Sequence, residues 1–165
     1  MILAADVAYD EAKDTATAAG VVFAYWADAQ PIAEYVVPIV GIAPYQPGAF
    51  YRRELPCLLA LLAVVRETLS TVIVDGYVDL EPGHAGLGRH LYLAMERRTA
   101  IVGVAKTPYT GAPAAEVRRG NSDSPLFVTA AGFDLAVASQ AVAAMHGSFR
   151  IPTMLKAADA LSRRR

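Results

Sequence analysis

Short apolar runs separated by polar turns occupy residues 1–41. Residues 1–10 (MILAADVAYD), 15–27 and 31–41 are rich in alanine, valine, isoleucine and tyrosine, and a polar turn at 28–31 separates the last two runs. Apolar runs of this length, bounded by turn residues, predict buried β-strands. Three such strands in succession predict an antiparallel meander at the start of the chain.

The hydrophobic period then changes from that of a strand to that of a helix. Within residues 52–69 the apolar side chains recur at helical spacing, at Leu55, Leu58, Leu59, Leu62 and Val65. This spacing predicts a helix, in which Pro56 is tolerable only in the first turn. A buried strand (71–75), a helix (87–96) and another buried strand (99–107) follow. The alternation of strands and helices predicts parallel crossover connections in this section.

The last part of the chain predicts a long loop, a short strand and two helices, at 107–125, 126–132, 134–147 and 151–165. Gly147 is placed to end the first of these helices, and Pro152 is placed to start the second. No internal repeat or linker-like segment interrupts the pattern. The sequence therefore predicts one α/β domain over residues 1–165, in which an antiparallel N-terminal meander leads into a mixed sheet with helices on both faces.

Composition agrees with a folded domain, and charge restricts its partners. A chain of 165 residues with 55% hydrophobic content is sufficient for a sizeable core. The formal net charge of -1 excludes the overall basic character by which many nucleic-acid-binding proteins are identified, so a nucleic-acid partner requires a local basic patch. Proline or charged residues interrupt the apolar runs well before the ~20 residues that a membrane-spanning helix needs, so we expect no membrane insertion.

The chain has a single cysteine, Cys57. One cysteine can form neither an intrachain disulfide nor a zinc site built from a cysteine pair, which is the pattern of an intracellular, cytoplasmic protein. Cys57 lies inside the apolar helical run and has no adjacent histidine. We therefore expect a buried structural thiol and not a nucleophile.

Four carboxylates stand at structurally defined positions: Asp6, Glu54, Asp75 and Asp159. Asp6 interrupts an otherwise apolar strand, and an uncompensated buried carboxylate costs several kcal/mol, so it needs a partner. That partner is either an arginine or a divalent cation. Asp75 is the last residue of its predicted strand and precedes Gly76, where it either holds an acid at an active site or begins an ordinary turn.

The four acids together favour a hard cation over separate structural roles. Mg²⁺ and Mn²⁺ take oxygen ligands from carboxylates and keep other positions open for phosphate and water. Such ligands need not be neighbours in the sequence, because acids from two strands and from flanking helices can converge at one end of a sheet. The sequence therefore predicts a divalent metal site built from these acids.

Short motifs occur in a fixed order along the chain. They are ADVAYD at 5–10, PYQPG at 44–48, Arg53-Glu54, VDG at 74–76, GVAK at 103–106 and Ala158-Asp159. Each motif alone is weak, but the ordered set runs over most of the chain. In this order and at these spacings, the sequence resembles the endonuclease V family.

The resemblance implies a ribonuclease H-like fold and a metal-dependent endonuclease. Such an enzyme cleaves DNA or RNA on the 3′ side of a deaminated base, chiefly the hypoxanthine of inosine or deoxyinosine. Matched motif by motif, the acids that would bind Mg²⁺, or Mn²⁺ in its place, are Asp6, Glu54, Asp75 and Asp159. Lys106 would lie near the scissile phosphate, where an ammonium group supplies a point charge. Without the resemblance, the preferred interpretation of Lys106 is a lysine at a strand edge, with its stem on apolar surface and its ammonium in solvent.

The family resemblance also assigns a nucleic-acid-binding segment. Pro44, Tyr45, Pro47 and Gly48 would form a stiff wedge beside the damaged base, with the tyrosine ring filling the space that an extruded base leaves. Gly76 would let the backbone approach the flipped base. The alternative is an ordinary proline-rich turn with its tyrosine folded inward.

The segment after Gly76 departs from the family pattern. Two histidines and an arginine of the family are replaced by Tyr77, Glu81 and Gly83, with His84 near enough in sequence to compensate. Acids added beside a metal centre either serve as alternative ligands or repel a phosphate backbone. A segment that family members carry before the final helices also has no counterpart here, which removes phosphate contacts.

Three hypotheses follow from these observations. The first is a metal-dependent endonuclease acting on inosine-containing nucleic acid. The second is a divergent relative that is weakly active or non-catalytic and binds nucleic acid. The third is a structural or partner-binding α/β domain, which would leave Asp6 without a role.

Overall fold

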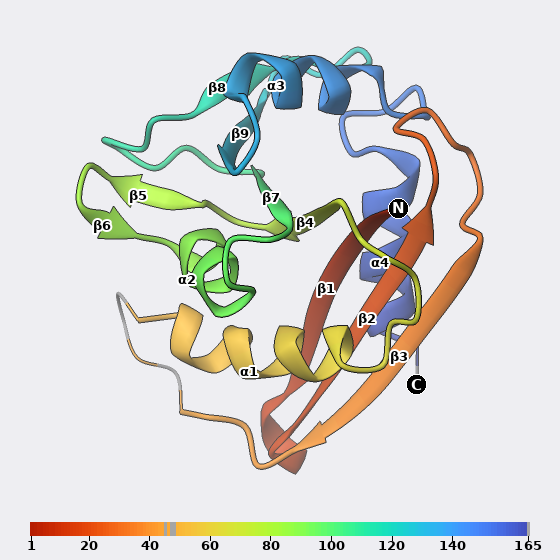
Figure 1. Cartoon of the computed structure of the whole chain (residues 1–165), viewed down its shortest axis with the longest axis vertical. Helices are drawn as coiled ribbons and strands as arrows, with labels where there is room; N and C mark the ends of the chain where they lie inside the picture. Colours follow the sequence, from red (N-terminus) through yellow and green to blue (C-terminus); the bar gives the residue numbers. More distant parts are fainter. Residues whose placement is uncertain (45, 47–48, 165) are drawn as a thin grey trace.

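A seven-stranded mixed sheet forms the centre of the computed structural model, which describes residues 1–44, 46 and 49–164 (Figure 1). The strand order is β3-β2-β1-β4-β7-β9-β8. The strands are β1 (Ile2–Asp10), β2 (Thr15–Phe23), β3 (Ala33–Val40), β4 (Thr71–Asp75), β7 (Ala100–Ala105), β8 (Ala115–Val117) and β9 (Leu126–Ala131). A small hairpin adds β5 (Asp79–Glu81) and β6 (His84–Ala85).

The strand directions agree with the predicted mixed sheet. Strands β1, β2 and β3 are antiparallel, which is the predicted meander. Strands β1, β4 and β7 are parallel, as the crossover helices require. Strand β9 returns antiparallel to β7, and β8 pairs antiparallel with β9 at the edge. The carboxyl ends of β4 and β7 therefore lie side by side.

Helices cover both faces of the sheet, as predicted (Figure 1). They are α1 (Tyr51–Leu62), α2 (Leu87–Ala94), α3 (Leu135–Ala144) and α4 (Thr153–Ser162). Successive residues of a strand face opposite sides, so β1 buries Ala4 in one core with α3 and α4, and Leu3 in the other with α1 and α2. None of the helices in the described part of the chain has the length and apolar character that a bilayer crossing requires.

The first helix differs from its predicted bounds. It begins at Tyr51, so Pro56 lies beyond the first turn, and it ends at Leu62 instead of continuing to residue 69. The backbone N–H of Arg66 donates to the hydroxyl of Tyr35 at 3.4 Å, and that hydroxyl donates to Glu67 at 2.9 Å. These contacts with β3 hold the following segment out of the helix.

Two segments contain short strands that were not predicted. The interval 107–125, predicted as loop, contains β8, which exists through its pairing with β9. The segment after Gly76 folds into the β5–β6 hairpin. Strands of two or three residues carry no readable periodicity, so the flanking glycines and prolines dominate the sequence signal. Helix α3 also ends at Ala144, before Gly147, whereas α4 follows Pro152 as predicted.

Candidate active site

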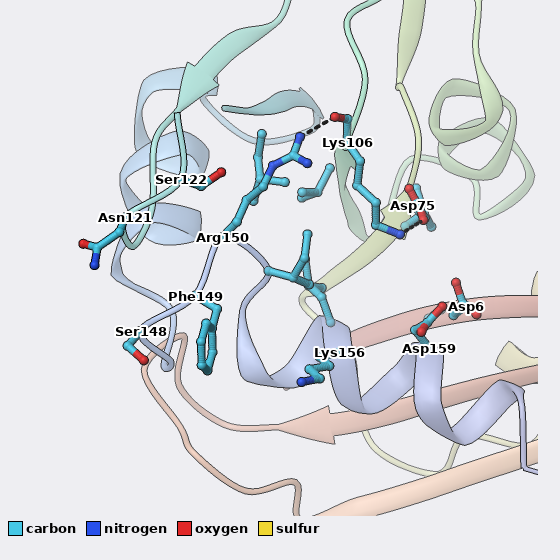
Figure 2. Close-up of a pocket in the computed structure, with 16 residues that line it drawn as sticks. Asp6, Asp75, Lys106, Asn121, Ser122, Ser148, Phe149, Arg150, Lys156 and Asp159 are labelled. Carbon is cyan, nitrogen blue, oxygen red and sulfur yellow. Dashed lines mark hydrogen bonds and ion pairs between the residues drawn. The ribbon is translucent and has the colours of Figure 1, made fainter. Parts of the chain in front are cut away.

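Three of the predicted site residues project from neighbouring parallel strands onto one face of the sheet. Asp6 lies within β1, Asp75 ends β4, and Lys106 directly follows β7. The register pairs Ala5 with Val74, which places Asp6 and Asp75 on adjacent strands. Because side chains alternate along a strand, all three point to the side covered by α3 and α4 (Figure 2).

Asp75 and Lys106 form a direct ion pair. The ammonium nitrogen of Lys106 lies 2.5 Å from a carboxylate oxygen of Asp75, and both side chains are a little under half exposed. Burial lowers the pKa of Lys106, but the hydrogen bond and the negative charge of Asp75 raise it, with smaller contributions from Asp159 and Asp6, and the net shift is upward. Lys106 is therefore a cation held among carboxylates.

Asp6 finds its hydrogen-bond partner in the last helix. The hydroxyl of Ser162 donates to Asp6 at 2.5 Å and also lies 2.8 Å from the carbonyl of Asp159. Burial raises the pKa of Asp6, and the charges of Asp159 and Asp75 raise it further, against the lowering effects of Ser162 and Lys106. The side chain that hydrogen-bonds to Asp6 is therefore the hydroxyl of Ser162, and not the arginine that was considered as its partner.

Asp159 approaches the other acids from α4. Its carboxylate accepts a hydrogen bond from Arg163, one helical turn later, at 2.9 Å. It lies near Asp6 in the view of Figure 2, consistent with its effect on the pKa of that residue. The predicted final acid is therefore brought to the same face of the sheet as Asp6 and Asp75.

Glu54 reaches this neighbourhood from the opposite side of the sheet. It lies in the first turn of α1 and is 5% exposed. Burial raises the pKa of Glu54 to about 8, together with the charges of Asp6 and Asp75, and the nearby guanidinium of Arg53 opposes the shift. Four acids far apart in the sequence thus form one electrostatic neighbourhood.

The donor set matches the chemistry of a hard divalent cation. As the side chains stand, no three histidine, cysteine, aspartate or glutamate residues within the described ranges are close enough together to hold a metal ion. Yet burial raises the pKa of both Asp6 and Glu54, the charge of Asp6 adds to the shift of Glu54, and a cation would favour the ionised forms of both. The carboxylates therefore fit Mg²⁺ in kind, and their assignment as ligands stays a prediction.

Burial of Glu54 predicts a dependence of stability on pH. The folded chain keeps this proton up to about pH 8, whereas the unfolded chain releases it near 4.5, so the folded state binds more protons between these values. The free energy of unfolding should therefore fall, by roughly a few kcal/mol, as pH rises through this window. Glu54→Gln should remove most of this fall.

The measurement is the melting temperature in EDTA across this pH range. Glu116→Gln is the matched control, because Glu116 is an exposed acid on β8. The control should keep the pH dependence of the wild type. Parallel curves for Glu54→Gln and the wild type would contradict the predicted burial of a protonated Glu54.

Three of the four acids line one end of a pocket of about 800 Å³ (Figure 2). Asp6, Asp75, Lys106 and Asp159 belong to this lining, and the opposite end is formed by the loop between α3 and α4. Sequence reasoning missed Ser162 and Arg163. Their spacing of three and four residues from Asp159 on one helix is a signal that could have indicated them.

The segment after Asp75 is held close against β7. Gly76 has a φ of 131°, and a Cβ at Gly103 would lie 2.5 Å from the Gly76 carbonyl oxygen. The backbone N–H of Val78 donates to Thr129 at 2.8 Å, and the hydroxyl of Tyr77 donates to the carbonyl of Thr107 at 2.7 Å. Tyr77, which replaces a family histidine, is therefore buried and hydrogen-bonded.

The acids of the hairpin have partners of their own. Asp79 accepts two hydrogen bonds from Arg89, at 2.9 and 2.6 Å, so its charge is neutralised by a bidentate pair. Glu81 is exposed and lies 3.7 Å from His84. Of the acids in this segment, Glu81 is therefore the one left to act on a phosphate backbone.

The predicted wedge lies mostly outside the described residues. Tyr45, Pro47 and Gly48 fall there, and Pro44 is exposed. Their assignment to nucleic-acid binding stays a prediction. Cys57, in contrast, is buried as predicted, and its thiol contacts the carbonyl of Arg53 at 3.5 Å.

Comparison with known proteins agrees with the motif pattern. A family model described as Endonuclease V matches residues 1–132. The endonuclease V of Streptomyces avermitilis is 33% identical over 180 residues, which cover 96% of this chain and 77% of that protein. The chain belongs to the endonuclease V family. The Streptomyces coelicolor endonuclease V is 37% identical over 109 residues, which cover 64% of this chain and 44% of that protein.

Solved endonuclease V structures share this fold. The Streptomyces avermitilis crystal structure matches with a TM-score of 0.80 and 28% identity, over 98% of this chain and 79% of that one. A second match is an endonuclease V of Ciona intestinalis, crystallised with a 23mer DNA containing an inosine followed by a ribo-adenosine. Its TM-score is 0.84 and its identity 19%, over 98% of this chain and 83% of that one. The sheet is therefore the predicted ribonuclease H-like fold.

Proposed function

We propose that this chain is a metal-dependent endonuclease that cleaves DNA or RNA on the 3′ side of inosine or deoxyinosine. The observation that carries the proposal is the gathering of Asp6, Asp75 and Asp159 around Lys106, with Glu54 near Asp6 and Asp75, in a member of the endonuclease V family. The inosine-containing DNA bound by the Ciona intestinalis relative supports the choice of substrate. Repair or processing of deaminated nucleic acid is the corresponding role.

The four acids would hold Mg²⁺, with Mn²⁺ able to replace it. When bound, the ion would lower the pKa of a coordinated water and neutralise charge that develops on the phosphate. Asp75 and Asp6 would supply ligands from adjacent strands. Glu54 would lose its proton on binding the ion, because a cation favours the ionised carboxylate.

Lys106 would supply a positive charge to a phosphate oxygen. Its ammonium already lies at hydrogen-bond distance from Asp75, so a phosphate that reached the acids would meet it there. The upward shift in its pKa keeps Lys106 protonated. Tyr45, which Pro44 and Pro47 flank in the sequence, would occupy the space left by the flipped inosine.

The test is cleavage of matched oligonucleotides that differ only at one inosine. Single- and double-stranded DNA and RNA would each be incubated with Mg²⁺, Mn²⁺ or EDTA, and the product ends would be mapped. We expect cleavage 3′ of inosine with either metal, little cleavage of unmodified strands, and none in EDTA. Equal cleavage with and without inosine would contradict the proposed substrate, and cleavage in EDTA would contradict the metal requirement.

A second candidate is a nucleic-acid-binding relative that cleaves weakly or not at all. The observation in its favour is that Lys106 pairs with Asp75 while the described acids stand too far apart to hold an ion. The same oligonucleotide experiment separates the two candidates, because this one predicts inosine-dependent binding without products. For either candidate we propose a cytoplasmic location, on the strength of a single, buried cysteine.

A further inference from the structure

The pocket beside the acids extends well beyond them. Its far end is formed by Phe149 on the loop between α3 and α4, with Asn121 and Ser122 adding polar groups (Figure 2). Ile151 and Leu155 add apolar surface to the lining. Its volume of about 800 Å³ is in the range of sites that bind small organic ligands. The pocket thus joins an end suited to phosphate chemistry to an end suited to an aromatic ligand.

Phe149 is exposed although its loop is firmly held. The side chain of Phe149 is 72% exposed. Beneath the loop, the buried guanidinium of Arg119 donates to five backbone carbonyls, those of Ala143, Met145, Gly147, Phe149 and Arg150. The anchored loop thus holds this aromatic ring in a fixed place, where it forms part of the pocket lining.

The same loop is tied to the acid end of the pocket. Arg150 donates to the carbonyl of Pro125 at 2.8 Å and to the carbonyl of Lys106. The carbonyl of Lys106 belongs to the residue whose ammonium pairs with Asp75. The position of Phe149 relative to the acids is therefore defined by hydrogen bonds from the Arg119 and Arg150 side chains to backbone carbonyls.

A cation lies beside the ring. The ammonium of Lys156, on α4, is 5.9 Å from the centre of the Phe149 ring, and the side chain is exposed. Among the described residues, no carboxylate pairs with Lys156. An aromatic face next to an unpaired ammonium can bind the base and the phosphate of a nucleotide. Phe149 lies at the end of the pocket opposite the acids.

We propose that this pocket binds an undamaged nucleotide that flanks the scissile phosphate, with its base stacked on Phe149 and a phosphate near Lys156. The inference rests on the proposed function, because it assigns the site to the same strand. Of the residues assigned to the flipped inosine, the two that the structure describes, Pro44 and Gly76, do not line this pocket. Stacking on an aromatic face accepts any base, so the site adds affinity and little sequence preference.

Fluorescence of 2-aminopurine tests the stacking directly. Inosine-containing strands with 2-aminopurine placed singly at each flanking position would be bound to the full chain in EDTA, which prevents cleavage. At one flanking position we expect quenching on binding, because stacking on an aromatic ring quenches this base. Phe149→Ala should abolish most of that quenching. Tyr25→Ala is the matched control, because Tyr25 is an aromatic residue with 73% exposure that lies outside the pocket lining.

Cleavage and salt dependence supply the second readout. Phe149→Ala should lower kcat/KM for inosine strands roughly tenfold, and this loss should disappear when the stacked position is made abasic. Lys156→Gln should reduce the slope of log affinity against log salt by about 0.7 to 0.9, the effect of one phosphate contact. Phe149→Trp should retain both quenching and cleavage.

The outcomes separate this inference from the proposed function. Quenching that is unchanged in Phe149→Ala at every position would overturn the inference, even if inosine strands are cleaved. Quenching that depends on Phe149 in a chain that cleaves no inosine strand would support the nucleotide pocket and overturn the nuclease function.

Discussion

Asp75→Asn is expected to lower the rate of cleavage at inosine by roughly 10²- to 10³-fold, the loss typical of removing one electrostatic stabiliser from an active site. The amide is uncharged, so it cannot favour a bound cation as the carboxylate does, and it leaves Lys106 without its anionic partner at 2.5 Å. Binding of the nucleic acid should persist, because phosphate contacts are made by basic residues.

The measurement is single-turnover cleavage of an inosine strand, together with binding of the same strand in EDTA. Glu116→Gln is the control, since it removes one negative charge from the exposed edge strand β8. It should cleave at the rate of the wild type. If Asp75→Asn cleaved as fast as this control, Asp75 would have no part in the chemistry.

The largest effect on stability is expected for Arg119→Ala, at about 3 kcal/mol or more. Arg119 is 6% exposed and donates to five carbonyls at the end of α3 and in the following loop. A hydrogen bond to a charged group makes a net contribution of about 1.5 to 3 kcal/mol, and truncation leaves buried acceptors without a donor. The loop that carries Phe149 should lose its fixed position.

Chemical denaturation of Arg119→Ala beside Arg118→Ala provides the comparison. Arg118 is the neighbouring residue in the sequence, but it is exposed and donates to a single carbonyl, that of Asp123, at 2.9 Å. Arg118→Ala should therefore unfold at nearly the denaturant concentration of the wild type. Equal midpoints for the two variants would show that the buried guanidinium does not anchor the loop.

The ion pair between Lys106 and Asp75 does not balance the charges of Asp6 and Glu54. Lys106 neutralises Asp75, but Asp6 and Glu54 still have raised pKa values, because each is desolvated by burial and each lies near other carboxylates. A carboxylate pair in this state is stabilised either by protons or by a cation. The same geometry thus accounts for the expected loss of stability at high pH and for the proposed metal requirement.

The sequence by itself was enough to predict the meander, the parallel crossovers and the family. Strand and helix periods are local properties, so runs such as 1–10 and 71–75 could be read directly. The ordered motifs likewise indicated Asp6, Glu54, Asp75 and Asp159 as a set before any contact was known. Alternation along β1, β4 and β7 then required the strand acids to share a face, because the strands are parallel neighbours.

Only the tertiary structure decided which groups meet. Ser162 donates to Asp6 across 156 positions of sequence, and no periodicity links the two. Arg119 falls in the segment 107–125 that the sequence predicts as loop, yet it is buried beneath the α3–α4 loop. The end of α1 and the existence of β8 were likewise decided by contacts with β3 and β9. Hydrogen bonds and edge pairing between distant segments depend on how the whole chain packs, and a local pattern does not contain that information.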